Sequence, residues 1–224
     1  MFNSIFVKNL LCVVIFAFTG LVCRAQKVIE PDLSALLKAN KISAVNRSVT
    51  QISTDVKKNV LHLDGKPDAG IAWIDDIRFS DGIIEFDVKG KNVLQQSFVG
   101  IAFHGSNDST YDAIYFRPFN FKSTETERRN HSVQYISLPK FDWPVLRKEH
   151  PNQYEKPIDP APEPEEWLHA KIVVDGLNVK VFVNNNAQAS LVVKKLGNSN
   201  NGKIGFWVGY DSDGDFSELK IAQK

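Results

Sequence analysis

Cysteine is almost missing from this chain of 224 residues. The two cysteines, Cys12 and Cys23, both lie within the first 25 residues. If that segment is removed, the rest of the chain has no disulfide, no thiol nucleophile and no cysteine-ligated metal. A domain of this size is then held together by its core alone. This suits a bacterial periplasm or surface better than a small secreted disulfide scaffold.

An excess of charge of one sign is missing as well. The chain has 27 basic and 26 acidic residues, for a formal net charge of +1. This balance argues against a nucleic-acid partner, since such proteins carry a basic surface. Ordinary numbers of glycine and proline exclude collagen-like and low-complexity chains. Hydrophobic residues make up 43% of the sequence, with 15 Phe among them, which is enough for one large core.

Several catalytic signatures are also absent from the sequence. It contains no Gly-x-Ser-x-Gly elbow, no His-Glu-x-x-His motif, no phosphate loop and no dinucleotide fingerprint. The five histidines are scattered without metal-ligand spacing. We therefore predict no cofactor. A structural calcium ion held by Asp211, Asp213 and Asp215 is a weak alternative, because this segment lacks the closing glutamate of an EF-hand and is typical of a β-turn.

Residues 1–25 are predicted to be a secretory signal peptide. Lys8 supplies the positive charge, and an apolar run from Leu10 to Phe18 follows it. Small residues at the −3 and −1 positions predict cleavage after Ala25, so we expect a secreted or periplasmic protein. The apolar run is shorter than the roughly 20 residues of a membrane span. Acylation of Cys23 is the weaker alternative, because Val22 stands where a small residue is expected.

The remaining chain has the pattern of many short strands. Alternating apolar and polar residues bounded by turn signals predict twelve of them, at 49–53, 59–63, 70–75, 82–89, 97–104, 111–117, 131–137, 168–175, 178–184, 189–195, 203–209 and 215–222. This indicates an all-β protein, a two-sheet antiparallel β-sandwich, over residues 46–224. Residues 26–45 are expected to be a separate N-terminal segment, either one short helix or loose.

One region departs from the strand pattern. Residues 138–166 contain seven prolines, and we predict a long loop there. Loops of this length in compact domains are usually functional. Its Trp143, Arg147, Tyr154 and Glu155 either contact a ligand or pack the loop over the sheet.

The alternation also predicts which face each strand presents. In residues 84–88 the apolar side chains point to one face, while Glu85 and Asp87 point to the other. In the strands 97–104 and 111–117 the non-core face carries small residues, Tyr115, Arg117 and finally His104. A face of aromatic and planar polar side chains with small residues between them is typical of a sugar groove.

Two segments carry a resemblance to a known superfamily. These are the closing residues Gly202–Gly209 with Gly214–Ile221, and the hairpin Trp167–Asn184. They resemble the end of a concanavalin A-like lectin/glucanase jelly roll. Within that superfamily, the segments Ser97–His104 and Tyr111–Phe121 are most similar to exported bacterial domains of the 3-keto-disaccharide hydrolase type, which are family 16 glycoside hydrolase-like. The resemblance implies a jelly-roll fold and a carbohydrate partner.

The sequence departs from the glucanase pattern at the catalytic strand. Glu85-Phe86-Asp87 lacks the second glutamate, and His104 stands where an arginine is expected. Our candidate catalytic residues are Glu85, Asp87, His104 and Arg117. Our candidate substrate-binding residues are Tyr115, Asn120, Gln134, Trp143, Arg147 and Trp207. Each has a structural alternative: a solvated strand face for the two acids, a turn position for His104, and an ion pair with Asp112 or Glu85 for Arg117.

Two functions from different classes remain open. The first is a glycoside hydrolase or lyase that acts on disaccharides or glucosides, including their 3-keto forms as the resemblance implies. A ketone acidifies the neighbouring C–H, so one base could promote elimination while Arg117 stabilises the enolate. The second is a non-catalytic carbohydrate-binding, lectin-like module, which needs the aromatics and Arg117 but no perturbed acid or base. Nothing in the sequence indicates an oligomeric state.

Overall fold

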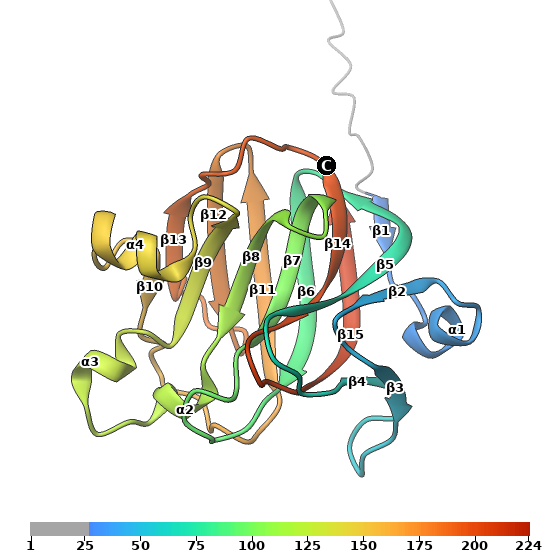
Figure 1. Cartoon of the computed structure of the whole chain (residues 1–224), viewed down its shortest axis with the longest axis horizontal. Helices are drawn as coiled ribbons and strands as arrows, with labels where there is room; N and C mark the ends of the chain where they lie inside the picture. Colours follow the sequence, from blue (N-terminus) through green and yellow to red (C-terminus); the bar gives the residue numbers. More distant parts are fainter. Residues whose placement is uncertain (1–26) are drawn as a thin grey trace, which may run out of the picture.

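The computed structural model describes residues 27–224, which form a sandwich of two β-sheets (Figure 1). The predicted signal peptide, residues 1–25, lies outside the described residues. Among residues 27–224, no helix is both long enough and apolar enough to cross a membrane.

All neighbouring strands in both sheets are antiparallel. The back sheet has the spatial order β13 (Leu191–Lys194), β12 (Asn178–Val183), β11 (Leu168–Asp175), β6 (Gly82–Lys89), β15 (Gly214–Gln223), β4 (Val60–Leu63) and β3 (Val49–Ile52), with β1 (Lys27–Ile29) paired to β15. The front sheet has the order β10 (Glu155–Lys156), β9 (Val133–Leu138), β8 (Thr110–Phe116), β7 (Val99–Asn107), β14 (Gly202–Val208), β5 (Gly70–Phe79) and β2 (Ile42–Val45). The predicted two-sheet antiparallel β-sandwich is confirmed.

Each of the twelve predicted strands overlaps an observed strand, and three further strands, β1, β2 and β10, were not predicted. Two of these three lie in residues 27–45, which we expected to stand apart from the sandwich. Instead β1 pairs with β15 of the back sheet, and β2 pairs with β5 of the front sheet. The short helix α1 (Leu33–Lys38) lies between them and is capped by Asp32, whose carboxylate accepts from the Ala35 N–H at 3.1 Å. The N-terminal segment is thus part of the sandwich.

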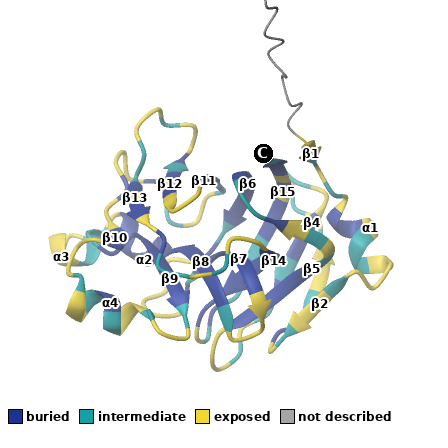
Figure 2. Ribbon diagram, turned by 90° about the horizontal axis from the view of Figure 1, so that it is seen from above, coloured by how far each residue is buried: buried dark blue, intermediate teal, exposed yellow. Residues whose placement is uncertain are grey.

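The core lies between the two sheets, on the faces that the alternation predicts. Ile84, Phe86 and Val88 of β6 are fully buried, as are the inward residues of β7 and β8. Phe206 of β14 bridges the layers, because its ring lies 6.2 Å from that of Phe86 and stacks at 4.6 Å on Phe216. Figure 2 shows these buried strands enclosed by more exposed loops and helices. Burial of large aromatic surface is the main stabilising contribution here.

Three short helices flank one end of the front sheet: α2 (Pro118–Phe121), α3 (Thr126–Arg129) and α4 (Trp143–Glu149) (Figure 1). Helix α4 and strand β10 lie in the segment that we predicted as a long loop. Asp142 caps α4 by accepting from the Trp143 N–H at 2.7 Å, and Pro144 stands in the first turn, where its missing N–H costs nothing. Buried Leu146 anchors the helix. The proline-rich segment therefore contains regular secondary structure and forms a wall beside the sheet.

Candidate functional site

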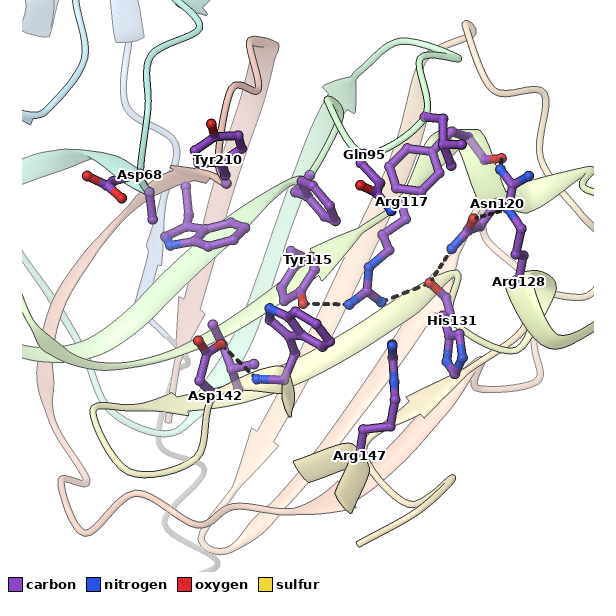
Figure 3. A pocket seen from close by; sticks show the side chains of 18 of the residues that line it. Asp68, Gln95, Tyr115, Arg117, Asn120, Arg128, His131, Asp142, Arg147 and Tyr210 are labelled. Carbon is purple, nitrogen blue, oxygen red and sulfur yellow. Dashed lines mark hydrogen bonds between the residues drawn. The ribbon is translucent and has the colours of Figure 1, made fainter. Parts of the chain in front are cut away.

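The outer face of the front sheet is hollowed into a pocket of about 730 Å³ (Figure 3). Ligand pockets for small molecules have volumes of about 300–1,000 Å³. Strands β8, β9 and β14 form its floor, and its walls come from the loops after β8, β9 and β14 and the loops before β5 and β7. The pocket is lined by Asp68, Ala69, Leu94, Gln95, Phe98, Tyr115, Arg117, Phe119, Asn120, Glu125, Arg128, His131, Ile136, Leu138, Asp142, Trp143, Arg147, Trp207, Gly209 and Tyr210.

Two aromatic rings meet at the centre of the floor. Tyr115 of β8 and Trp207 of β14 both stand opposite Gly100 of β7, one on either side. Their ring centroids are 4.8 Å apart. A Cβ on Gly100 would lie 2.8 Å from the Cβ of Tyr115 and 2.1 Å from the carbonyl of Ile114, so only glycine lets the two rings close over the middle strand. The Trp207 indole N–H donates to Tyr111 at 3.1 Å, which holds the ring in place.

Helix α4 supplies the wall with two side chains one turn apart. Trp143 remains 44% exposed. The guanidinium of Arg147 lies over its ring, 5.0 Å from the centroid. Arg147 also donates twice to Glu155 of β10, from Nε and Nη2, both at 2.8 Å. This bidentate pair attaches the helix to the edge of the front sheet.

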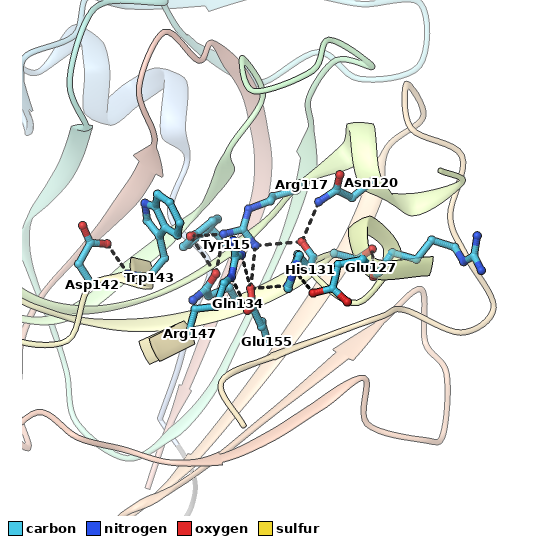
Figure 4. Close-up of polar contacts among 12 residues, drawn as sticks. Tyr115, Arg117, Asn120, Glu127, His131, Gln134, Asp142, Trp143, Arg147 and Glu155 are labelled. Atoms are coloured by element: carbon cyan, nitrogen blue, oxygen red, sulfur yellow. Dashed lines mark hydrogen bonds and ion pairs between the residues drawn. The ribbon is translucent and has the colours of Figure 1, made fainter. Parts of the chain in front are cut away.

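Glu155 is the centre of a buried polar cluster (Figure 4). Besides Arg147, its carboxylate lies 2.8 Å from Nδ1 of His131 and 3.6 Å from Nη1 of Arg117. Burial by itself would raise the pKa of Glu155, but the Arg147 hydrogen bonds and the neighbouring positive charges outweigh burial and lower that pKa. The carboxylate is therefore ionised at neutral pH.

Arg117 is held by the strands on both sides of it. Its Nη1 donates to the His131 carbonyl at 2.9 Å, and its Nη2 donates to the Tyr115 hydroxyl at 2.8 Å and to Gln134 Oε1 at 2.5 Å. Burial raises the pKa of Tyr115 to about 12, so this hydroxyl stays neutral. The expected ion pair of Arg117 with Asp112 or Glu85 is not formed; Glu155 lies beside it instead.

The opposite wall depends on a buried arginine that the sequence did not single out. Arg47 donates to three carbonyl groups, those of Asn46 at 2.5 Å, Asp68 at 2.7 Å and Gly209 at 2.7 Å. Two of these belong to residues that line the pocket. Arg47 thereby joins the loop before β5 to the loop after β14 and sets the width of the pocket.

All but one of the predicted substrate-binding residues line this pocket, and so does Arg117. The lining set contains Tyr115, Asn120, Trp143, Arg147 and Trp207. Gln134 is fully buried beneath Arg117. Asn120 points its amide at the same His131 carbonyl that Arg117 contacts, at 3.2 Å. The structure thus brings these residues together from β8, β9, β14, α2 and α4, while their role toward a ligand stays a prediction.

His104 does not join them. A β-bulge interrupts β7 and gives His104 a left-handed backbone, with φ of +52°. The bulge breaks the alternation, so the ring is buried and stacks at 5.7 Å on Phe79 rather than facing the pocket. Its Nδ1 lies 3.2 Å from Lys195 Nζ and 3.4 Å from Asp112. His104 therefore does not line the pocket that contains Arg117.

Glu85 and Asp87 lie on the outer face of the other sheet. Asp87 is paired at 2.6 Å with both Lys57 and His169, and Glu85 lies 3.9 Å from His169 and from Lys171. Burial would raise the pKa of Asp87, but the hydrogen bonds from His169 and Lys57 outweigh it and lower that pKa. The four predicted catalytic residues therefore occupy three separate places, because β6 and β8 belong to opposite sheets.

Two of the candidate calcium-binding residues interact with basic side chains. Asp213 forms an ion pair with Lys91, and Asp215 lies 2.7 Å from His62 Nδ1. Among residues 27–224, no group of three or more His, Cys, Asp or Glu side chains is arranged to hold a metal ion. Both the absence of a cofactor and the alternative of a structural calcium ion remain untested.

Sequence reasoning gave no role to His131, Arg128, Asp142 or Tyr210, which the structure places in the pocket. It mentioned Glu155 only as part of the proline-rich loop. One signal was available: Asp142-Trp143-Pro144 is a helix start, with a capping residue followed by proline in the first turn. Recognising it would have placed Trp143 and Arg147 on one helix face, four residues apart.

The solved structures that resemble this chain agree with the β-sandwich fold described above. No protein-family profile matches the sequence, and no curated protein matches it. A Bacillus subtilis protein of unknown function with a galectin-like fold is 15% identical, with a TM-score of 0.59 over 89% of this chain and 96% of the other. The carbohydrate binding module CBM66 from Bacillus subtilis is 14% identical, with a TM-score of 0.56 over 81% and 95%.

A third solved structure, a putative glycosyl hydrolase from Parabacteroides distasonis, is 14% identical, with a TM-score of 0.51 over 83% of this chain and 89% of the other. Likeness at this level of identity shows the fold alone. Together with the strand order, it shows that this chain has a two-sheet antiparallel β-sandwich fold like that of these solved structures.

Proposed function

We propose that this protein is a lectin-like module that binds carbohydrate in the pocket on the front sheet. The observation that carries the proposal is the aromatic lining of the pocket. Tyr115 and Trp207 form its floor, and Trp143 and Tyr210 stand at its rim, 44% and 57% exposed. Pyranose rings stack on such surfaces, and the planar donors of Asn120 and the arginines would meet their hydroxyls.

The charge state of the pocket favours binding over glycoside hydrolysis. That reaction needs one carboxylic acid of raised pKa and a second carboxylate at a defined distance. Glu155 has a lowered pKa and is engaged by two arginines and a histidine. Asp142 caps α4. These groups are therefore occupied in holding the walls.

The names of two neighbours support a carbohydrate ligand. One is a carbohydrate binding module and the other a putative glycosyl hydrolase. The fold is thus used by proteins of both descriptions. We also propose export through the predicted signal peptide, which would place the pocket among extracellular or periplasmic glycans.

A second candidate is the hydrolase or lyase acting on 3-keto-disaccharides or glucosides. The observation in its favour is the convergence of Arg117, His131 and Glu155. An arginine beside an imidazole could stabilise an enolate while the imidazole takes a proton. It is second because His131 lies between two carboxylates: its Nδ1 is 2.8 Å from Glu155, and its Nε2 is hydrogen-bonded to Glu127 at 3.1 Å.

One panel separates the two candidates. Wild-type protein is tested for binding by calorimetry and for turnover by chromatography, on neutral and acidic oligosaccharides, glucosides and their 3-keto forms. The test variant is Trp143→Ala. The matched control is Trp167→Ala, because Trp167 lies on the back-sheet side under Lys57, away from the pocket.

We expect saturable binding without turnover, weakened about tenfold by Trp143→Ala and unchanged by Trp167→Ala. Turnover of a 3-keto sugar that is lost in His131→Gln would establish the enzyme instead. Failure of every sugar to bind would refute the carbohydrate proposal, provided that the protein shows a cooperative unfolding transition.

A further inference from the structure

Two cationic side chains of the pocket, one in its floor and one in its wall, share one carboxylate. Two guanidinium groups, those of Arg117 and Arg147, share a single carboxylate, that of Glu155. Arg117 is 4% exposed, so water screens its charge poorly. Its other partners, Tyr115 and Gln134, are neutral acceptors. The two arginines and Glu155 therefore leave a net charge of about +1 at the base of the pocket.

The other charged side chains nearby contact different partners. His131 lies 3.1 Å from the exposed carboxylate of Glu127, and Arg128 lies 3.7 Å from Glu125. Among residues 27–224, Glu155 is the one carboxylate within ion-pair distance of Arg117 and Arg147.

Both arginines also have donors to spare. Arg147 uses Nε and one N–H of Nη2 for Glu155, and within residues 27–224 its Nη1 donates to no acceptor. Arg117 uses Nη1 and Nη2, and its Nε donates to no acceptor in the same part of the chain. A guanidinium with free N–H groups beside a stacking surface is suited to a planar carboxylate.

Two of the three acids that line the pocket, Asp68 and Asp142, lie at its other end, while Glu125 pairs with Arg128. Figure 3 shows Asp68 and Asp142 on one side of the aromatic floor, and Arg117, Arg128 and His131 on the other. The pocket is thus polarised along its length, with aromatic side chains between its two ends. A bound chain of sugars would meet acidic groups at one end and guanidinium groups at the other.

We infer that the ligand is an acidic oligosaccharide, and that Arg117 and Arg147 receive the carboxylate of a hexuronic acid residue. This inference rests on the proposed carbohydrate-binding function and names its ligand class. The sugar ring would stack on Trp143 or Trp207, while its carboxylate takes the unused donors. The ligand carboxylate would also balance the positive charge of the two arginines that Glu155 does not neutralise.

The test compares matched ligands on the wild-type protein. A hexuronic acid oligosaccharide, its carboxyl-reduced neutral counterpart and a sulfated oligosaccharide of the same length are titrated by calorimetry at low and high salt. We expect the carboxylate form to bind at least about tenfold more tightly than the reduced form. We also expect this preference to shrink at high salt, because salt screens the attraction.

Two variants locate the effect. Arg147→Gln should remove most of the preference for the carboxylate form, whereas the same change at exposed Arg78, outside the pocket, should leave it intact. Thermal unfolding of each variant shows whether it is folded. If Arg147→Gln does not fold, the salt dependence of the wild-type preference still decides the matter.

The outcomes separate this inference from the proposed function. Equal binding of the carboxylate and reduced forms would overturn the inference while leaving a carbohydrate-binding module. Tighter binding of the sulfated form than of the carboxylate form would overturn it too. Absence of binding to every oligosaccharide would overturn both.

Discussion

The two outer faces of this sandwich hold similar side chains in different states. On the back sheet, Lys57 lies 2.6 Å from both Asp87 and Glu218, and Asp87 pairs with His169 at 2.6 Å. A tryptophan, Trp167, lies 5.5 Å from the same lysine. Each charge there meets an opposite charge. On the front sheet, two guanidiniums share one carboxylate, and the aromatic rings surround a hollow.

The loops cause this difference, since both faces obey the same strand alternation. The segment after β9 carries α4 and β10, which rise beside the front sheet and enclose its face. Around Asp87 the back face is filled instead by Lys57 and His169, which both lie 2.6 Å from its carboxylate. Polar and aromatic residues on a strand therefore do not make a site by themselves. A site also needs loops that exclude water from part of the face.

The largest difference between the faces should come from neutralising one carboxylate on each. Glu155→Gln leaves Arg117 and Arg147 in the floor without their shared anion, and we expect it to lower the free energy of unfolding by about 3–5 kcal/mol. Glu85→Gln, on the partly exposed back face, should change that free energy by less than about 0.5 kcal/mol. Urea denaturation at neutral pH measures both. Similar losses for the two variants would contradict the comparison.

A smaller effect is expected from adding a methyl group at Gly100, beneath the aromatic floor of the pocket. A methyl group at Gly100 would meet the Ile114 carbonyl and the Tyr115 side chain. We expect Gly100→Ala to cost about 1–3 kcal/mol of unfolding free energy. It should also weaken ligand binding, since Tyr115 and Trp207 must separate. Denaturation and calorimetry on the same preparation test this; unchanged values for both would show that the floor is not built over this glycine.

The smallest effect concerns the pH response of the back face. The hydrogen bond with Asp87 raises the pKa of His169 above its usual value, although burial opposes this. The stabilisation from this pair is fully present below the unfolded-state pKa of about 6.5 and is lost as the pH rises through the higher folded-state pKa. His169→Gln should therefore flatten the fall in stability between neutral and mildly alkaline pH. A variant with the wild-type slope would show that the pair does not titrate in this range.

At acidic pH the dependence of stability on pH has the opposite sign. Asp87 and Glu155 both have lowered folded-state pKa values. Their stabilisation is present above the unfolded-state values of about 3.9 and 4.3 and is lost as the pH falls through the folded-state values. The unfolding free energy of His169→Gln should also be measured across this acidic range, because the variant removes one of the partners that lower the pKa of Asp87.

Local sequence was sufficient for most of the fold. Alternation is a property of each strand alone, so the inward positions of β6, β7 and β8 could be assigned before any pairing was known. Turn residues marked the ends of these strands. The same reasoning placed Tyr115, Arg117 and Trp207 on one non-core face. It failed at His104, because a bulge changes the direction of a side chain without changing the residue pattern.

What the sequence alone determined is the sandwich, its core faces and part of the pocket lining, namely Tyr115, Arg117, Asn120, Trp143, Arg147 and Trp207. Only the tertiary structure decided which strands share a sheet, and therefore that Glu85 and Asp87 lie far from Arg117. It also decided that Glu155 meets Arg117 and Arg147, since that contact joins β8, α4 and β10 across a long stretch of chain. Side chains alternate between the two faces of a strand every two residues, so this pattern is local. The order of strands in a sheet follows instead from the packing of the whole domain. Charge balance in a pocket depends on that packing.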